Sequence, residues 1–336
     1  MEFVRRLASP DVALSYPLDI DGSAPWSRDK STDGQATWQQ EISLPVIPAG
    51  HIIVPSFALR ESSSGDYAFN FSLHTETTRF DLQPVPVQQS AQAVAANPPN
   101  AAVSCHIDCW HTEQTLSAAK IRLSLTSVKK PTCYLLTVSV RALQNIVAVD
   151  FTEARSMTSE ILISVPASIS QMQAAKEIRA SICSPTALAM ALSVFDNAPS
   201  WDDTVQACYD PQSGGYGAWP LAIQWASRHG IMGAVEALTN WRDAIKILRC
   251  GVPMVCSIRF AKGKLHGAPL TQTGGHLVML HGLSGDHVQV KDPAAKNDKQ
   301  VDRRYRLDEF SEAWLQRRGA AYIFCGDLMQ NQQAAE

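Results

Sequence analysis

The sequence predicts a protein of two domains, an N-terminal all-β domain followed by a C-terminal α+β domain. Three observations support this division. The length of 336 residues is about twice that of an ordinary domain. Short segments in which apolar and polar residues alternate fill the first half, and this alternation is typical of strands. In the second half, apolar residues first recur at helical spacing, and strand-like segments follow.

The N-terminal domain, residues 1–155, is predicted to be a jelly-roll-like β-sandwich. Its clearest strand is 67–74, in which aromatic and apolar residues occupy every second position and therefore share one face. Turn signals separate short strand-like segments at the spacing that is typical of a sandwich. The expected strands are 38–44, 51–59, 67–74, 102–111, 121–126 and 133–140. The residues leave three roles for this domain open: targeting, binding of a partner, and covering of a cleft.

The C-terminal domain, residues 160–330, follows a boundary that we expect near residues 151–165. Its first helix carries an apolar stripe that includes Leu188 and Phe195, and Gly230 and Gly251 stand where helices should stop. The expected helices are 184–195, 217–229, 241–249 and 307–315. The expected strands are 252–260, 276–281 and 287–292. Helices followed by antiparallel strands indicate an α+β domain.

Composition excludes several classes of function. The chain has 29 Lys and Arg against 32 Asp and Glu, a net charge of −3, and an isoelectric point near 6.3. This balance argues against nucleic acid or an anionic membrane as a general electrostatic partner. No apolar run reaches the roughly 18 residues of a membrane span. Because the N-terminus has no apolar signal sequence, we expect a cytoplasmic location.

Eight cysteines are too few for a disulfide-stapled scaffold of this length. The segment 105–111 holds two thiols and two imidazoles, and as a strand it would place Cys105, Cys109 and His111 on one face. No second pair of ligands stands downstream at zinc-finger spacing. We therefore expect neither a metal nor a cofactor, and we interpret most of these thiols as core residues.

Cys183 differs from the other cysteines in its local sequence. Ser184 is a favoured N-cap residue and Pro185 is favoured at the first helical position, so Cys183 should lie at or just before a helix N-terminus. The amide donors and the helix dipole at such a position stabilise a thiolate, which is a competent nucleophile. A small buried residue beside a helix cap is the alternative interpretation.

A histidine and an aspartate lie on successive predicted strands. His276 opens one strand directly after two glycines, and Gly275 is therefore a candidate for close approach of a substrate. With a three-residue turn, His276 would stand directly opposite Asp292 on the same face of the hairpin, within hydrogen-bonding reach. A two-residue turn would shift the register by one and place the two side chains on opposite faces. A strand-end imidazole and a turn carboxylate are the alternatives.

These segments resemble motifs of one peptidase family. The stretch 182–192, with its Cys-Ser-Pro-Thr-Ala sequence, is similar to the nucleophile motif of the bacteriocin-processing, or double-glycine, C39 peptidase-like family. Residues 275–282 and 288–293 resemble its histidine strand and its Asp-Pro motif. Residues 165–171 resemble the segment that ends in the oxyanion-hole glutamine. The resemblance spans roughly residues 163–325 and leaves the N-terminal half unexplained.

The resemblance implies a papain-like cysteine peptidase fold in the C-terminal half. Cys183 would be the nucleophile, His276 the general base and later the general acid, and Asp292 the residue that orients the imidazole. Ser184 departs from the family pattern, which has glycine here, and this adds a side chain next to the nucleophile.

The resemblance also implies that Gln171, with the backbone amide of Cys183, binds the developing oxyanion. Gln171 lies 12 positions before Cys183, which makes the connecting loop long. Gln173 is the second candidate, and a solvated loop glutamine is the third interpretation. Trp219 follows a glycine-rich segment that has no phosphate-loop lysine. We interpret that segment as a loop lining the cleft, with Trp219 as a candidate substrate contact, or else as a turn capped by core aromatic residues.

The expected function is that of a thiol hydrolase that cleaves a peptide or isopeptide bond through an acyl-enzyme on Cys183. Its partner would be a peptide or protein substrate. Two alternatives stay open: an acyl or amide transferase that uses the same three residues, and a non-catalytic binding protein with the papain fold. The sequence does not distinguish water from an amine as the acceptor of the acyl group.

Overall fold

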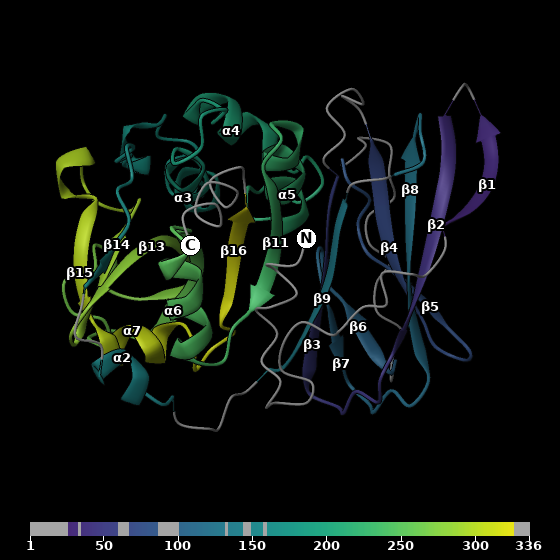
Figure 1. Ribbon diagram of the computed structural model, residues 1–336, viewed down its shortest axis with the longest axis horizontal. Coiled ribbons are helices and arrows are strands. Elements are labelled where there is room, and N and C mark those ends of the chain that lie inside the picture. Colours follow the sequence, from purple (N-terminus) through teal and green to yellow (C-terminus); the bar gives the residue numbers. More distant parts are fainter. Residues whose placement is uncertain are drawn as a thin grey trace, which may run out of the picture.

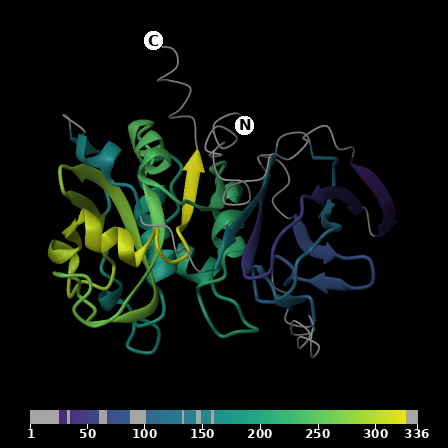
Figure 2. The same cartoon turned by 90° about the horizontal axis from the view of Figure 1, so that it is seen from below.

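The computed structural model describes residues 26–32, 35–59, 67–86, 101–131, 134–143, 149–156 and 160–325. Figures 1 and 2 show two halves side by side, with the N-terminal strands in purple to blue and the C-terminal elements in teal to yellow. The described strands form three sheets of five, four and seven strands. Every strand pair in them is antiparallel.

The N-terminal half contributes two of these sheets. The five-stranded sheet has the order β1 (Ser27–Thr32), β2 (Gln35–Leu44), β8 (Ala119–Ser127), β4 (Ala68–His74), β5 (Arg79–Asp81). The four-stranded sheet has the order β6 (Val103–Cys105), β7 (Trp110–Thr112), β3 (His51–Leu59), β9 (Tyr134–Ala142). Both contribute side chains to one core, for example Phe71 and Leu123 from the first and Phe57 and Val140 from the second. The jelly-roll-like connectivity of the expected sandwich stays a prediction.

Strand β3 is buried on both faces, which explains its nearly continuous apolar sequence. Ile53 and Phe57 face the core shared with the five-stranded sheet. Ile52 and Val54 face the C-terminal half. The four-stranded sheet is therefore a middle layer of the molecule, and it joins the two halves through apolar contacts.

One predicted N-terminal strand is wrong. The segment 102–111 forms two short strands, β6 and β7, with a tight turn in which the backbone amide of His106 donates to the carbonyl of Cys109 at 2.9 Å. The turn breaks the alternation, so Cys105 packs against the core of the N-terminal half, whereas Cys109 and His111 stay together, with Sγ and Nε2 4.0 Å apart. Cys133, at the start of the strand expected at 133–140, lies outside the described residues.

The C-terminal half is built on the seven-stranded sheet. Its order is β11 (Met232–Ala237), β16 (Ala320–Cys325), β12 (Met254–Phe260), β13 (Thr273–Ser284), β14 (His287–Lys291), β15 (Asp302–Arg306), with β10 (Ile161–Leu162) also paired to β13. The helices are α2 (Thr152–Ser156), α3 (Cys183–Leu192), α4 (Trp201–Ala207), α5 (Trp219–Arg228), α6 (Trp241–Arg249) and α7 (Leu307–Ala313). Strands β11, β15 and β16 and helix α4 were not expected from the sequence.

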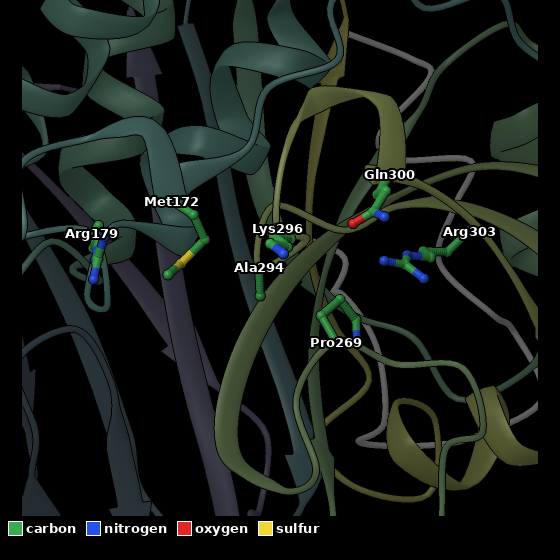
Figure 3. Close-up of a pocket in the computed structure, with 7 residues that line it drawn as sticks. All are labelled: Met172, Arg179, Pro269, Ala294, Lys296, Gln300 and Arg303. Carbon is green, nitrogen blue, oxygen red and sulfur yellow. The ribbon is translucent and has the colours of Figure 1, made fainter.

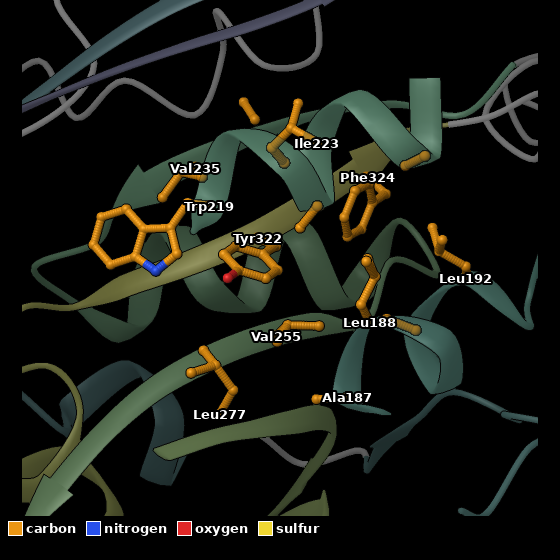
Figure 4. Packing of buried hydrophobic residues seen from close by; sticks show 14 of the residues in the cluster. Ala187, Leu188, Leu192, Trp219, Ile223, Val235, Val255, Leu277, Tyr322 and Phe324 are labelled. Carbon is orange, nitrogen blue, oxygen red and sulfur yellow. The ribbon is translucent and has the colours of Figure 1, made fainter. Parts of the chain in front are cut away.

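Alternation along the strands gives this sheet two buried faces. Val255 and Tyr322 point to the face that α3 and α5 cover, and the four-stranded sheet packs on the same side. Figure 4 shows part of this cluster, with Tyr322 and Phe324 against the helices. Cys256 and Ile323 point to the other face, which α6 and α7 cover. The α+β half thus has a layered core on each side of its sheet.

The packing boundary between the halves lies earlier in the chain than residue 155. Strand β9 ends at Ala142, and Val149 and Ala154 already belong to the C-terminal core. Arg155 forms an exposed ion pair with Asp286 at 2.9 Å. Helix α2 therefore packs with the C-terminal half, although the predicted division assigned it to the N-terminal domain. Within the described ranges, no helix is long and apolar enough to cross a membrane.

Candidate active site

Cys183 is the first residue of α3 and is half-buried. The N-cap is Ile182, which has no capping side chain. If Ser184 were the N-cap, the helix would begin at Pro185, so the observed helix begins two residues earlier than the sequence predicted. Pro185 still lies in the first turn, where its missing N–H breaks no helical hydrogen bond. Cys183 therefore lies at the positive end of the helix, as the sequence predicted.

Ser184 does not crowd the thiol of Cys183. Its side chain is buried, and its hydroxyl forms a 2.9 Å hydrogen bond with the hydroxyl of Tyr322 in the core between α3 and the sheet. The departure from the family's glycine is thus accommodated by a tyrosine on β16. Sequence reasoning could not find this partner, because the two residues are 138 positions apart.

His276 and Asp292 are in direct contact. The Nε2–H of His276 donates to Oδ1 of Asp292 at 2.8 Å, and the two side chains are 3% and 1% exposed. His276 lies near the start of β13, and Asp292 directly follows β14. The predicted hydrogen bond between them is therefore present.

The hairpin that joins them differs from the prediction. Ser284 pairs with His287, so the turn has two residues rather than three, and the expected direct opposition is wrong. A bulge between Leu280 and Gly282 then shifts the register so that Met279 faces Lys291. Continued by one residue, this register brings Asp292 to the same face as His276, diagonally across the hairpin. The bulge reverses the change of face that a two-residue turn alone would cause.

Asp292 accepts three hydrogen bonds. Its Oδ1 also accepts from the backbone amide of Ala294 at 3.0 Å, and its Oδ2 accepts from the hydroxyl of Tyr305 at 2.7 Å. Burial raises the pKa of Asp292, but the charge of His276 and these hydrogen bonds outweigh it, so the pKa lies below the usual value. Tyr305, on β15, was missed because no sequence motif marks it.

The thiol and the imidazole change each other's ionisation. Burial raises the pKa of Cys183, but the hydrogen bond and the charge of His276, with amides of Leu277 and Ser184, lower it below the ordinary value. Burial lowers the pKa of His276, but Asp292 and then Cys183 raise it to about 10. Because Nε2 faces Asp292, Nδ1 is the nitrogen left for Cys183. The arrangement therefore shifts the two groups toward a thiolate beside an imidazolium.

The other described cysteines lack this environment. Burial raises the pKa of Cys208 to about 12 and that of Cys105 to about 11, and it also raises the pKa of Cys109, Cys250 and Cys256. These five and Cys183 are all free thiols. Among the six cysteines whose side chains the structure describes, only Cys183 has a lowered pKa. In the described ranges, no three His, Cys, Asp or Glu side chains come together in a group that could hold a metal ion.

Gln171 begins a short 3₁₀ helix, Gln171–Gln173, next to the Asp-Pro segment. Its backbone amide donates to the carbonyl of Pro293 at 2.9 Å, and its buried side chain donates through Nε2 to the carbonyl of Arg179 at 2.6 Å. This leaves one Nε2 hydrogen, while Oε1 is buried without a hydrogen-bond partner among the described residues. Gln173 is exposed and donates to Asp298. Of the two candidates, only Gln171 is held directly against the segment that carries Asp292.

Gly275 and Trp219 have opposite environments. Gly275 is exposed, and a Cβ added there would meet no atom within 4 Å, so space is open beside His276. Trp219 is 7% exposed and belongs to the core (Figure 4). It is the first residue of α5, and its backbone amide donates to Asp108 at 3.2 Å. The glycine-rich segment before Trp219 lies outside helices, as expected, but the buried Trp219 itself fits the alternative of a core aromatic residue better than that of a substrate contact.

Three comparisons with known proteins place this site in context. Residues 163–322 match the model of the Peptidase_C39 like family. A crystal structure of a protein described as a C39-like peptidase from Bacillus anthracis is 17% identical, covers 50% of this chain and 98% of its own, and has a TM-score of 0.40. No curated protein matches the chain.

Proposed function

Since the C-terminal region of the chain is C39-like, and this family suggests cysteine peptidase activity, we propose that the protein cleaves a peptide or isopeptide bond with Cys183 as its nucleophile. One observation carries the proposal. Of the six cysteines whose side chains the structure describes, only Cys183 has a lowered pKa, and the group that lowers it, His276, is held by a buried hydrogen bond to Asp292. Such a triad of nucleophile, base and orienting group is the recurrent arrangement of acyl-transfer enzymes.

In the proposed mechanism, the Cys183 thiolate attacks the carbonyl carbon of the scissile bond, and the carbonyl oxygen becomes an oxyanion. The imidazolium of His276 then donates its proton to the leaving amine as the carbon–nitrogen bond breaks, which leaves a thioester on Cys183. Neutral His276 next takes a proton from water, whose oxygen attacks the thioester and releases the acid. Asp292 keeps the imidazole oriented through both transfers.

The oxyanion needs hydrogen-bond donors at the start of α3. We propose the backbone amide of Cys183 as one donor and the remaining Nε2 hydrogen of Gln171 as the other. The support for Gln171 is its fixed side chain, which the carbonyl of Arg179 holds from one side, while the amide hydrogen bond to Pro293 ties its backbone to the Asp292 segment. Removal of one such donor typically costs about 100- to 1,000-fold in kcat.

The test is the pH dependence of alkylation by an iodoacetamide probe, read by mass spectrometry of each cysteine. The proposal requires rapid labelling of Cys183 well below the ordinary thiol pKa of about 8.5. His276→Ala should suppress this labelling at mildly acidic pH, because the thiol loses the cation that lowers its pKa. Cys250→Ala is the matched control, since Cys250 is also half-buried but has a raised pKa. Labelling of Cys183 no faster than that of Cys250 would refute the proposal.

A second measurement identifies the acceptor of the acyl group. Incubation with peptides in the presence and absence of a primary amine, followed by mass spectrometry, separates hydrolysis products from amide products. Hydrolysis requires the free acid to dominate in both samples.

A further inference from the structure

A pocket of about 420 Å³ lies beside the candidate active site (Figure 3). Three segments surround it: the one before Cys183, the loop before His276 and the segment after Asp292. Its lining residues are Met172, Arg179, Pro269, Ala294, Lys296, Gln300 and Arg303. Figure 3 shows Met172 and Arg179 on one side, Ala294 and Lys296 in the middle, and Gln300 and Arg303 on the other side.

Three of the lining residues connect the pocket to the site. Met172 follows Gln171 in the same 3₁₀ helix. The backbone amide of Ala294 donates to Oδ1 of Asp292, the same oxygen that accepts from His276. Arg179 provides the carbonyl that holds the Gln171 side chain. In a peptide bound across Cys183, the residues next to the scissile bond can therefore reach this pocket.

The lining is strongly cationic. Arg179, Lys296 and Arg303 are three of its seven residues, and none of the seven is acidic. The ion pairs seen between described residues include none of these three. The Nε of Arg303 is buried without a partner among the described residues, and its Nη1 reaches only the carbonyl of Gly267, at 3.5 Å.

Two carboxylates on the neighbouring chain segments have other partners. Oδ1 of Asp298 accepts from the backbone amide of Ser170 at 2.7 Å and from the Gln173 side chain. Asp302 pairs with Lys291 at 2.8 Å. Three like charges around one hollow repel each other, and an anion placed between them would reduce this repulsion. Arginine and lysine together suit a carboxylate, which accepts several charge-assisted hydrogen bonds.

From this lining we infer that the pocket is a subsite for a carboxylate of the substrate, supplied by an acidic side chain or by the C-terminus of the peptide. The inference rests on the proposed function, because it assigns the specificity of that same site. It makes acidic peptides the preferred substrate class.

The test compares two libraries of octapeptides that are otherwise random, one with Glu fixed at each position in turn and one with Gln fixed at the same positions. Each is made with a free and with an amidated C-terminus, which separates a side-chain carboxylate from a terminal one. We expect wild-type protein to cleave the preferred carboxylate peptides at least tenfold faster in kcat/KM, which corresponds to about 1.4 kcal/mol.

Charge reversal in the pocket should remove this preference. Lys296→Glu should bring the ratio of rates close to one or below it. Lys299→Glu is the matched control, since Lys299 is an exposed lysine three positions further along, in the short 3₁₀ helix Asp298–Gln300, and does not line the pocket. It should leave the ratio unchanged. Equal cleavage of both libraries by active protein, or an equal effect of the two charge reversals, overturns the inference and leaves the proposed function intact.

If no peptide is cleaved, a binding measurement still tests the subsite independently of the proposed function. Cys183→Ala protein is dialysed to equilibrium against the same libraries, and retained peptides are quantified by mass spectrometry. Preferential retention of carboxylate peptides that disappears in the Cys183→Ala, Lys296→Glu double variant supports the subsite even without hydrolysis. Equal retention of the two libraries refutes it.

Discussion

At the scale of single residues, the ionisation of the site depends on Asp292. A buried carboxylate would ordinarily take up a proton, but Asp292 accepts hydrogen bonds from His276, Ala294 and Tyr305, and these keep its pKa low. The negative charge then stabilises the protonated form of His276, which in turn stabilises the thiolate of Cys183. The charge on each of these three groups thus stabilises the opposite charge on the group beside it.

The first prediction concerns pH. Below the lowered pKa of Cys183 the sulfur is a thiol, so activity should rise as pH increases through that value and the thiolate forms. Activity should fall again near pH 10, where His276 loses the proton that the leaving amine needs. A profile of kcat/KM against pH, with the ultraviolet absorbance of the thiolate measured in parallel, checks both limbs. A single rise at the ordinary thiol pKa of about 8.5 would contradict the thiolate–imidazolium pair.

The second prediction concerns Tyr305→Phe. This change removes the donor to Oδ2 of Asp292 and leaves a buried, charged oxygen unpaired, which should cost about 1–3 kcal/mol of unfolding free energy. The pKa of Asp292 should rise, and the alkaline limb of the activity profile should move to lower pH because His276 is less well stabilised. Denaturant unfolding and the pH profile measure the two effects.

Tyr209→Phe is the control for this change, because Tyr209 is 45% exposed and should tolerate the loss of its hydroxyl within about 0.5 kcal/mol. An alkaline limb that stays in place in Tyr305→Phe would show that the tyrosine supports the fold but not the ionisation of the site.

At the scale of secondary-structure elements, the hairpin of β13 and β14 decides whether His276 meets Asp292. The bulge after Leu280 changes the register, and β10 pairs with β13 at the same place, where Leu162 faces Gly282. A Cβ added to Gly282 would lie 2.7 Å from the carbonyl oxygen of Ile161 and 3.0 Å from Cβ of Gln289. Glycine is therefore required here for close approach of two backbones.

The third prediction is that Gly282→Ala destabilises the protein by about 1–3 kcal/mol, since the overpacked strand must shift. The shift should also weaken the contact between His276 and Asp292, so that kcat falls more than KM changes. Gly217→Ala is the matched control, because a Cβ there meets no atom within 4 Å. Thermal unfolding and steady-state kinetics test the pair. Equal behaviour of the two variants would mean that the bulge tolerates a side chain.

At the scale of the whole molecule, the two halves share buried polar contacts as well as the apolar layer on β3. Arg141 of β9 is 1% exposed, and its guanidinium donates to the carbonyl of Leu238 at 2.6 Å and to that of Leu315. Burial lowers the pKa of Arg141 to about 10, so it stays protonated at neutral pH. Ser139 of the same strand donates to Glu236 of β11 at 2.9 Å. These contacts make separate unfolding of the halves unfavourable.

The fourth prediction is that Arg141→Met lowers the unfolding free energy by about 2–4 kcal/mol, because two buried carbonyl groups lose their donors. In calorimetry, the wild-type protein should unfold in one transition, and the variant should unfold at a lower temperature. Arg122→Met is the control, since Arg122 forms a partly exposed ion pair with Glu41 at 2.6 Å, and such pairs contribute about 0–1 kcal/mol. Two separate wild-type transitions would contradict the coupling of the halves.

Several features of this molecule followed from local sequence because they depend on neighbouring residues. Helix α6 has the predicted bounds, since Asn240 caps it and Gly251 follows it with a positive φ of 73°. The position of Cys183 at a helix start and the apolar run of β3 were likewise predicted. Periodicity, caps and turn residues act over only a few positions, and a sequence displays them directly.

Other features were decided only by contacts between residues far apart in the chain. The partners of Ser184 and Asp292, which are Tyr322 and Tyr305, lie on strands that the sequence did not reveal. The register of the triad hairpin depends on a bulge beside β10, and the burial of Trp219 on a core built by both halves. The sequence by itself determined which residues could carry the chemistry. Tertiary structure decided how they meet, because strand register and side-chain burial depend on packing between distant segments.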